Sequence, residues 1–456
     1  MSRENGAIDR GEGADDLVGI GFGPANLALA IAVDEHNRRD PQQALKVGFL
    51  EKQARFGWHR GMLLEGATMQ VSFLKDLVTM RDPRSRFTFL TYLQERGRLA
   101  DFINQKSFYP TRLEFHDYFE WCAAEFADRT AYGRRVTAVH PVTSPDGRVE
   151  YVEVVSESVT DPADREVRTA RNIAVGTGLK PRLPQGVTAG DRVIHTRDLL
   201  FRAPDLIERR EELRHRRFTV VGAGQSAAEA VEFLHRTFPE AEICAVLTRY
   251  GYSPADDSPF ANRIFDPSAV DEFYAAPEQA KKTLLDYHAN TNYSVVDGDL
   301  IEQLYRTVYQ EKVAGRERLR ILNATRLTGV GHLADGAVAE VRSLTTGETL
   351  ALESDAVVLA TGYEHVDPRD LLGELGASCR TDELGRLRVD RDHRVLTEDH
   401  VEVGIYLQGG TEHTHGITSS LLSTLAVRSG EICDSLLLRH TGRQLRAEDG
   451  RLGVTG

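Results

Sequence analysis

Two stretches of the chain share one pattern of apolar and polar positions. An apolar run, a glycine-rich turn, a stretch of helical length and a second apolar run follow one another in residues 16–52 and again in residues 217–249. In the second copy Ala227, Val231 and Leu234 recur at spacings of four and three, which places them on one face of a helix. Each stretch therefore predicts a strand, a helix and a second strand.

Two later apolar runs each end in a threonine–glycine step, at residues 171–178 and 355–362. Strands alternating with helices are typical of a parallel α/β sheet, whose ligands lie at the carboxyl ends of the strands. Residues 255–313 differ, because they combine helix and loop signals with several aromatic side chains. The pattern thus predicts an α/β fold with two dinucleotide-binding, Rossmann-like domains and a smaller, mostly helical substrate-binding segment.

The first glycine turn, GFGPAN, runs from Gly21 to Asn26. A dinucleotide fingerprint needs its first glycine for a tight turn and its second, here Gly23, for close approach to the pyrophosphate. The helix that begins near Pro24 faces the negative charge. Asn26 takes the place of the third glycine, and Glu51 ends the next strand, where an acid binds a ribose hydroxyl. The alternative is a strand–helix turn with chance glycines, but the full context favours a nucleotide.

The second glycine turn, GAGQSA, contains Gly222, Gly224, Gln225 and Ser226. The strand that follows it ends in Arg249 in place of an acid. An arginine pairs with a ribose 2′-phosphate, which a carboxylate would repel, although a solvated surface arginine is the alternative. The first turn therefore suits FAD and the second suits NADPH.

Two dinucleotide folds in one chain indicate a flavoprotein that is reduced by a pyridine nucleotide. We expect an FAD-binding domain over residues 15–205, completed by residues 366–438. An NADPH-binding domain is expected over residues 206–365, of which 255–313 contributes the substrate-binding segment. Disordered tails are predicted at the two polar, glycine-rich ends, residues 1–14 and 439–456.

Composition and charge exclude several other classes. Asp and Glu outnumber Lys and Arg by 69 to 56, and the net charge of −13 disfavours nucleic acid or an anionic membrane as a partner. The four cysteines form no CxxC pair, which argues against a zinc ribbon and a dithiol redox centre. The apolar run 17–33 is short, contains three glycines and follows two acids, so we expect neither a membrane span nor an export signal. A cytoplasmic enzyme that passes electrons to oxygen or a small organic molecule is predicted.

Several longer stretches resemble one family of flavoproteins. They are GFGPANLALA, MQVSFLKDLV, ADDSPFANRIFDP, NTNYSVVDGDL and THGITSSLLS, and the similarity extends from about residue 16 to residue 431. These stretches resemble the microbial N-hydroxylating flavin monooxygenases, and within them the L-ornithine monooxygenases of hydroxamate siderophore biosynthesis. The resemblance implies that NADPH, FAD and O2 hydroxylate the side-chain amine of L-ornithine through a flavin hydroperoxide, with NADP⁺ retained during catalysis.

The resemblance also implies a role for individual residues. Lys75 would bind the amino-acid carboxylate, and Asn262 would hold the substrate backbone. Gln70, Asn292 and Ser423 would lie beside the flavin, the nicotinamide ribose and the side-chain amine. These three are the catalytic candidates, and they also contact the substrate.

The remaining predicted contacts belong to the two cofactors. For FAD they are Gly21, Gly23, Pro24, Asn26, Glu51, Lys52, Trp58, His59, Gln70 and Leu421. For NADPH they are Gly222, Gly224, Gln225, Ser226, Arg249, Asn292, Thr361 and Gly362. No metal is expected, because His413 and His415 form an HxH pair without a third ligand nearby and flavin activates oxygen without a metal.

Three other interpretations stay open. L-Lysine N-hydroxylation needs only one more methylene of reach, but ADDSPFANRIFDP resembles the ornithine branch. A Baeyer–Villiger or sulfur-oxidising monooxygenase is the second, although the FxGxxxHxxxW signature is missing. A non-catalytic redox sensor that binds flavin and NADPH is the third. We also expect a homo-oligomer, either a dimer or a tetramer.

Overall fold

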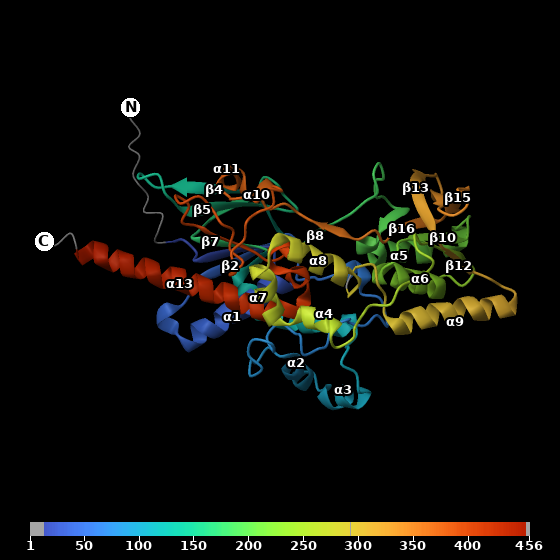
Figure 1. The fold of residues 1–456 in the computed structure, drawn as a ribbon, viewed down its shortest axis with the longest axis horizontal. Helices are drawn as coiled ribbons and strands as arrows, with labels where there is room; N and C mark the ends of the chain where they lie inside the picture. Colours follow the sequence, from blue (N-terminus) through green and yellow to red (C-terminus); the bar gives the residue numbers. More distant parts are fainter. Residues whose placement is uncertain (1–12, 292, 453–456) are drawn as a thin grey trace.

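The computed structural model describes residues 13–291 and 293–452, which form two units, each built around a five-stranded sheet (Figure 1). In the first unit the strand order is β18-β7-β1-β2-β3, and all neighbouring strands are parallel. These strands are β1 (Leu17–Ile20), β2 (Val47–Glu51), β3 (Thr130–Tyr132), β7 (Asn172–Val175) and β18 (Gly404–Leu407).

The second sheet has the order β12-β11-β10-β16-β9 and is also entirely parallel. Its strands are β9 (Val193–His195), β10 (Arg217–Val221), β11 (Glu242–Val246), β12 (Leu319–Leu322) and β16 (Ala356–Leu359). The two parallel sheets confirm the predicted α/β fold with two Rossmann-like domains.

Each glycine turn leads directly into a helix. α1 (Pro24–Arg39) follows the first turn and α6 (Gln225–Thr237) follows the second. Ala227, Val231 and Leu234 are all buried, so α6 presents its predicted apolar face to the core of the second unit.

The remaining helices cover the sheets or form the connections between strands. Within the described residues, no helix is long and apolar enough to cross a bilayer. These helices are α2 (Phe89–Glu95), α3 (Leu99–Gln105), α4 (Arg112–Ala124), α5 (Leu199–Glu208), α7 (Pro267–Ala275), α8 (Glu278–His288), α9 (Gly298–Ala314), α10 (Arg369–Leu372), α11 (Glu374–Ala377), α12 (Glu412–His415) and α13 (Leu425–Leu452).

Antiparallel strands, which the sequence did not predict, complete both units. In β14 the side chains of Ala337, Ala339 and Val341 are buried and those between them are more exposed, which is the two-residue period of a half-buried strand. A further pair, β8 with β17, links the two units. The strands are β4 (Arg134–Thr143), β5 (Val149–Ser158) and β6 (Arg165–Ala170); β13 (Thr325–His332), β14 (Ala337–Ser343) and β15 (Thr349–Ser354); β8 (Leu179–Pro181) and β17 (Tyr363–His365).

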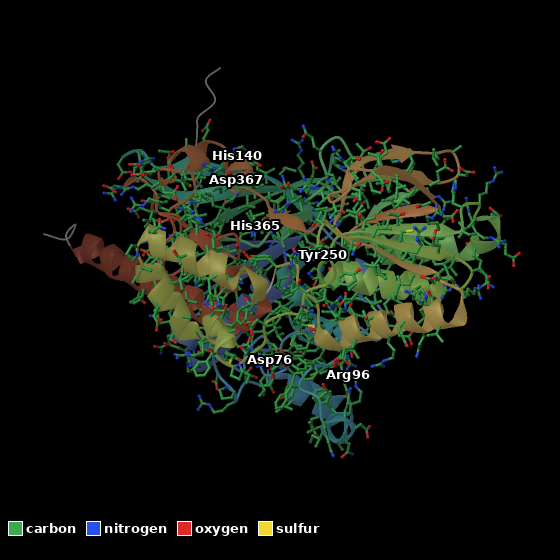
Figure 2. All side chains as sticks on the ribbon, turned by 45° about the vertical axis from the view of Figure 1, so that its right-hand side comes forward. Asp76, Arg96, His140, Tyr250, His365 and Asp367 are labelled. Carbon is green, nitrogen blue, oxygen red and sulfur yellow. The ribbon has the colours of Figure 1, made fainter. Side chains whose placement is uncertain are left out.

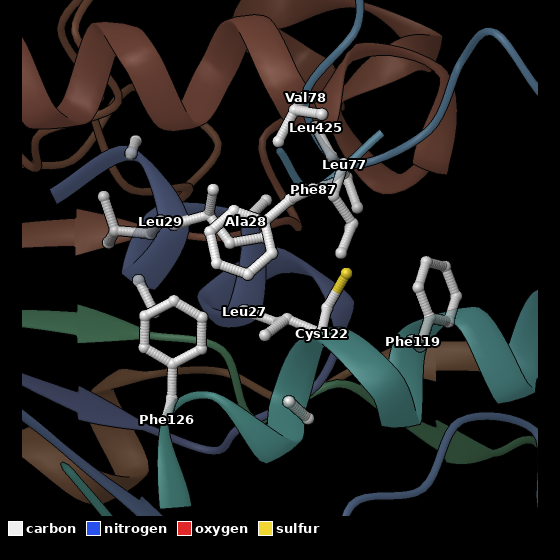
Figure 3. Close-up of a cluster of buried hydrophobic side chains, with 14 of the residues drawn as sticks. Leu27, Ala28, Leu29, Leu77, Val78, Phe87, Phe119, Cys122, Phe126 and Leu425 are labelled. Atoms are coloured by element: carbon white, nitrogen blue, oxygen red, sulfur yellow. The ribbon is translucent and has the colours of Figure 1, made fainter. Parts of the chain in front are cut away.

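An aromatic core fills the first unit between α1, α4 and α13. Phe119 and Cys122 of α4 lie with Phe87, Phe126 and Leu425 in one cluster (Figure 3). Each of the three phenylalanines is at most 1% exposed. Burial of such rings is worth about 1.5–3 kcal/mol each, so this cluster fixes α4 and the start of α13 against α1.

All four cysteines are free thiols inside the protein. Burial raises the pKa of Cys244 and of Cys379 to about 11, and that of Cys433 to about 12. Burial also raises the pKa of Cys122 well above its usual range. The thiols therefore stay protonated at neutral pH.

Two predicted boundaries around the second unit are wrong. β9 begins at Val193 and pairs with β16, so the first unit ends before residue 205. The sequence did not reveal this strand because three residues are too few to show a periodic pattern. α9 packs on α6 and buries Leu304 in the core of the second unit. It is a crossover helix of that unit, and α7 and α8 remain as the helices of the predicted substrate-binding segment, called the substrate segment below.

The predicted C-terminal tail is also wrong over residues 439–452, because α13 extends to Leu452. Arg439 donates a hydrogen bond to the carbonyl of Glu402, and Nδ1 of His440 lies 3.2 Å from the carboxylate of Asp16. These two contacts hold the helix on the first sheet beyond residue 438. The predicted N-terminal tail lies outside the described residues, except for residues 13 and 14.

Arg112 on α4 and Glu229 on α6 join the two units. Nη1 and Nη2 of Arg112 donate to the two carboxylate oxygens of Glu229 over 2.9 and 2.7 Å. Nη1 also donates to the carbonyl of Met62 over 3.0 Å. The side chains of Arg112 and Glu229 are only 13% and 5% exposed, so water cannot replace either partner.

We expect Arg112→Ala to lower the free energy of unfolding by about 3–5 kcal/mol, because Glu229 would keep a buried charge without its partner. The matched control is Arg96→Ala. Arg96 lies at the end of α2 on the periphery of the molecule (Figure 2) and pairs with Asp117, with side chains 45% and 41% exposed. Its pair is worth at most about 1 kcal/mol. Urea unfolding of both variants measures the difference, and equal losses would contradict the role of the buried pair.

Candidate functional site

The first glycine turn lies at the carboxyl end of β1, and its geometry requires a glycine at position 21. Gly21 has φ +84°, and a Cβ there would overlap the carbonyl oxygen of Gly176. At Gly23 a Cβ would meet no atom within 4 Å, and no side chain caps the helix that begins after it. Pro24 occupies the first position of that helix, where its missing N–H has no intrahelical partner to lose. The free N–H groups of α1 thus face an open space that suits a pyrophosphate.

Glu51 stands at the tip of β2 beside this turn. Its two carboxylate oxygens accept the backbone N–H groups of Phe22 and Gln53 over 2.7 and 2.8 Å. Each oxygen keeps a lone pair for a further donor such as a ribose hydroxyl. The geometry of strand tip, turn and acid therefore fits the adenosine end of a dinucleotide.

The side chain of Asn26, a predicted cofactor contact, is bound to backbone carbonyls. Its side chain is 1% exposed, and Nδ2 donates to the carbonyl of Gly21 over 2.6 Å. The same amide also lies 3.4 Å from the carbonyls of Ile20 and Ala174. Asn26 therefore links the ends of β1 and β7 from inside, and its side chain does not point toward the open space.

Three further FAD candidates, Trp58, His59 and Lys52, lie in the first unit after β2. Trp58 packs edge-on against Phe119 with ring centroids 5.4 Å apart, and against His59 at 4.9 Å. His59 has a left-handed backbone with φ 48° and its ring lies 6.2 Å from that of Tyr363. Lys52 is exposed next to Glu51.

The second glycine turn has the same geometry at the carboxyl end of β10. Gly222 has φ +144°, and a Cβ there would overlap the carbonyl oxygen of Ala360. A Cβ at Gly224 would lie 3.3 Å from Cα of Ser294, so the backbone at Ser294 passes close to the turn. Ser226 is half-buried in the first turn of α6. The turn therefore forms a second helix terminus suited to phosphate.

The rim of this turn carries the remaining NADPH candidates. Arg249 is exposed after the end of β11, and its Nη1 donates to the carbonyl of Ser294 over 3.1 Å. The hydroxyl of Thr361 donates to the carbonyl of Arg182 over 2.5 Å. The carbonyl of Gly362 lies 3.0 Å from Nε2 of His195. Thr361 and Gly362 thus belong to the crossing between the units.

A chain of polar contacts joins the second glycine turn to the first unit. Nε2 of Gln225 lies 3.0 Å from Glu229 and 3.1 Å from Asp297, and its Oε1 accepts the N–H of Asp297 over 2.9 Å. The carboxylate of Asp297 also accepts a hydrogen bond from Gln70, while burial raises the pKa of Asp297. Because Glu229 binds Arg112, the structure brings Gln70 of the first unit to Gln225 of the second.

Lys75 faces the substrate segment. Its Nζ lies 5.6 Å from the ring centroid of Phe265, and burial lowers the pKa of Lys75, an effect that the nearby Asp266 opposes. Both neighbours adjoin Asn262 in or after the 3₁₀ helix Ala261–Phe265. Nδ2 of Asn262 donates to the carbonyl of Asp257 over 2.7 Å. The structure thus places Lys75 beside the short segment that contains Asn262.

Leu421 and Ser423 lie on a loop, residues 417–424, that leads into α13. Leu421 is half-buried, and Ser423 is buried in the 3₁₀ helix Leu422–Thr424. The hydroxyl of Thr424 donates back to the carbonyl of Thr418 over 3.3 Å and closes the loop. Asn292, the third catalytic candidate, lies outside the described residues.

A polar contact beside Asn292 was not anticipated from the sequence. The hydroxyl of Tyr293 donates to the carboxylate of Glu412 over 2.6 Å, and Oγ of Ser420 lies 3.3 Å from Nε2 of His365. Burial raises the pKa of Glu412, but hydrogen bonds from His365, Tyr293 and Ser420 outweigh it and lower the value. Tyr293 and Glu412 are 119 residues apart, so no local signal could reveal the pair.

A cavity of about 460 Å³ lies between the substrate segment and residues 415–418. Phe260, Arg263, Phe273 and His288 are among its lining residues. It offers an apolar wall with a few charged groups, as small-molecule sites do.

The HxH pair makes ordinary backbone contacts. Nε2 of His413 lies 2.8 Å from the carbonyl of Leu387, and Nε2 of His415 lies 3.2 Å from the carbonyl of Arg391. Among the residues that the structure describes, no group of three His, Cys, Asp or Glu side chains is placed to hold a metal ion.

Known proteins match the chain over most of its length. A sequence profile of the L-lysine 6-monooxygenase/L-ornithine 5-monooxygenase family matches residues 14–365. An L-ornithine N(5)-monooxygenase of Burkholderia cepacia is 44% identical over 405 residues, which cover 88% of this chain and 89% of the relative.

Solved structures give the same picture. The Kutzneria sp. 744 ornithine N-hydroxylase, solved with reduced FAD, NADP⁺ and L-ornithine, is similar with a TM-score of 0.87 and 48% identity, covering 93% of this chain and 99% of that chain. The L-lysine 6-monooxygenase of Pseudomonas syringae has a TM-score of 0.80 and 33% identity, with the same coverage of 93% and 99%.

We expect Gly21→Ala to lower the free energy of unfolding more than Gly66→Ala. Both glycines have a left-handed backbone, φ +84° and +82°, which costs alanine about 1–2 kcal/mol at either position. At Gly66 no atom lies within 4 Å of the new Cβ, whereas at Gly21 it would overlap a backbone oxygen. Overpacking adds about 1–3 kcal/mol there. Chemical denaturation checks the difference, and similar losses for both variants would refute the close approach of the turn to Gly176.

Proposed function

Because the chain belongs to the L-lysine 6-monooxygenase/L-ornithine 5-monooxygenase family, we propose that it hydroxylates the side-chain nitrogen of L-ornithine with FAD, NADPH and O2. The observation that carries the proposal is the placement of Lys75 beside the Asn262 segment in a chain with two glycine-rich dinucleotide turns. When bound, FAD supplies the activation of oxygen and NADPH supplies the hydride.

We assign FAD to the first unit. The N–H groups of α1 behind Gly21 and Gly23 would hold the pyrophosphate, and Glu51 would accept a ribose hydroxyl. The ring-bearing end would extend toward Trp58 and His59, and on to Leu421 and Gln70. Lys52 is exposed and would contact the outer part of the cofactor.

We assign NADPH to the second unit. The N–H groups at the start of α6, with Gly222, Gly224 and Ser226, would hold its phosphates. Arg249 is placed after the end of β11, where a ribose 2′-phosphate would lie, and a guanidinium binds phosphate with paired hydrogen bonds. Gln225 stabilises the turn through Asp297.

Ornithine would lie with its amino-acid end toward Lys75 and Asn262. A charge-assisted hydrogen bond from Lys75 would fix the carboxylate and leave the side-chain amine free. An alkylammonium has a pKa near ~10.4, so its nitrogen must lose a proton before it can react. A buried position beside Ser423 would favour the uncharged amine by desolvation.

The experiment that tests the function compares ornithine with lysine. With the amino-acid end fixed, lysine's extra methylene would misplace its amine, and an error of about 1 Å can cost about a hundredfold in rate. We expect hydroxylamine formed per NADPH consumed to be high for ornithine and low for lysine. Equal yields would remove the selectivity, and a higher yield for lysine would reverse the substrate assignment. Peroxide alone from both would support the redox-sensor alternative.

We expect Lys75→Ala to weaken ornithine binding by about 1.5–3 kcal/mol, the worth of a hydrogen bond to a charged group. NADPH oxidation should continue without ornithine, because the variant leaves both glycine turns intact. Lys282→Ala is the matched control, since Lys282 is an exposed lysine of α8 that pairs with Asp286. Saturation kinetics with ornithine measures the effect. An unchanged KM in Lys75→Ala would exclude Lys75 from the site.

The predicted dimer or tetramer and the predicted cytoplasmic location stay predictions. Sedimentation of the purified chain would measure the first, and fractionation of the producing cell would measure the second.

A further inference from the structure

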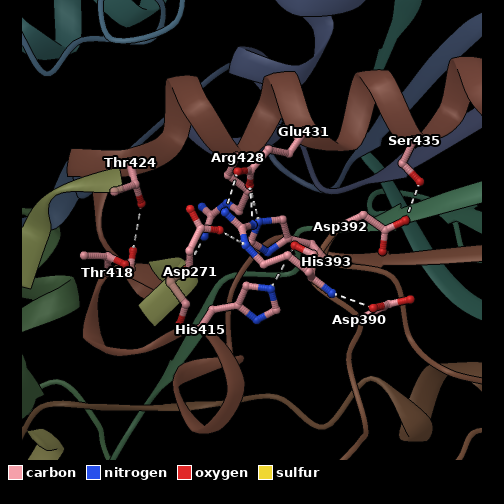
Figure 4. A network of polar contacts seen from close by, with 12 residues as sticks. Asp271, Asp390, Asp392, His393, His415, Thr418, Thr424, Arg428, Glu431 and Ser435 are labelled. Carbon is pink, nitrogen blue, oxygen red and sulfur yellow. Dashed lines mark hydrogen bonds and ion pairs between the residues drawn. The ribbon is translucent and has the colours of Figure 1, made fainter. Parts of the chain in front are cut away.

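Arg391 connects the substrate segment with the last helix of the protein. Its Nε donates to the carboxylate of Asp271 on α7 over 2.7 Å. Its Nη1 and Nη2 donate to both carboxylate oxygens of Glu431 on α13 over 2.9 and 2.7 Å. The side chains of Arg391 and Glu431 are 27% and 29% exposed, so the bidentate pair is largely shielded from water. Figure 4 shows Asp271 and Glu431 in one polar network.

The Glu431 end of this bridge is held firmly. Nε2 of His393 lies 3.0 Å from the same carboxylate. Burial raises the pKa of Glu431, but the hydrogen bonds from His393 and Arg391 outweigh it and lower the value to about 2. Glu431 is therefore ionised at every pH at which the protein would work.

The helix that carries Glu431 also holds the loop that carries Ser423. Arg428, one turn before Glu431, is 4% exposed and donates a hydrogen bond to the carbonyl of Ser419. Thr424 closes the same loop on Thr418. A displacement of α13 would therefore displace Ser423.

The helix at the other end of the bridge contacts the residue that directly precedes the same loop. α7 directly follows the short segment of Asn262, and the ring of Phe273 lies 3.3 Å from the position of a Cβ at Gly416. The backbone carbonyl of Arg391 lies 3.2 Å from His415, which precedes that glycine. Arg391 thus stands where α7, the loop and α13 meet.

We propose that Arg391 and Glu431 are positioning residues that set the separation between the Asn262 segment and the Ser423 loop. This inference rests on the proposed function, since the two elements would hold opposite ends of ornithine. Loosening the bridge would let α7 move away from the loop, and the side-chain amine would lose its alignment. NADPH oxidation would continue, because neither residue adjoins a glycine turn.

The first test measures hydroxylamine per NADPH consumed, and the KM for ornithine and for NADPH, in Arg391→Gln, Arg391→Lys and Glu431→Gln. We expect Arg391→Gln to lower the hydroxylamine yield about tenfold or more and to leave the KM for NADPH unchanged. Arg391→Lys should recover part of the yield, because lysine keeps the charge but not the bidentate geometry.

The matched control is Arg386→Gln. Arg386 also joins the first unit to the substrate segment, through Glu278 of α8 at 3.0 Å, but its other partner is Asp382 of its own loop. Its loss should leave the yield unchanged. A yield that falls equally in Arg386→Gln, or does not fall in Arg391→Gln, would overturn the proposal.

A second measurement does not depend on turnover. Amide hydrogen exchange of the purified protein should be faster over α7, residues 267–275, in Arg391→Gln and unchanged over α6, residues 225–237. Unchanged exchange over α7 would contradict the bridging role of Arg391, whatever the activity of the protein. Absence of hydroxylamine from the wild-type protein would instead refute the proposed function and leave the bridge untouched. Should Arg391→Gln fail to fold, Arg391→Lys and Glu431→Gln, which keep the side-chain volume, decide both measurements.

Discussion

Arg112 of α4 and Glu229 of α6 bury opposite charges between the two units, and this pairing holds the second glycine turn against the first unit. Neither charge can be hydrated there, so the two units are stable only in the orientation that keeps both hydrogen bonds. Glu229 also contacts Gln225, whose amide binds Asp297. The same interaction therefore connects α4 of the first unit to the second glycine turn and to Asp297.

The parts of the fold that the sequence predicts are those with a local cause. The strand before Gly21 and the helix of Ala227 and Val231 follow from apolar runs, a left-handed glycine and a helical period, all within a few residues. Asn26 departs from the fingerprint, and its side-chain amide links the ends of two strands. The sequence predicts a tail from residue 439, within the final helix, because this stretch is polar and glycine-containing. The partner of His440 there, Asp16, lies 424 residues away in the chain.

Sequence motifs indicate candidate site residues, but they do not indicate the distant contacts that hold those residues in place. The family resemblance assigns roles to Lys75 and Ser423, because each lies in a local motif that can be read without knowing its distant contacts. Arg391 has no such signal, because its two partners lie 120 residues before it and 40 residues after it. A surface arginine in a polar stretch is indistinguishable by sequence from one that connects two helices. Ion pairs between distant elements need coordinates before they can be found.

The four buried thiols have a consequence for a protein that handles reduced flavin and oxygen. Such chemistry releases hydrogen peroxide whenever the substrate is absent or misaligned, and peroxide attacks thiolates rather than thiols. With the pKa of Cys244 and Cys379 raised to about 11 and that of Cys433 to about 12, almost no thiolate forms at neutral pH. The protein is therefore built to tolerate its own by-product, and its working life should not depend on added reductant.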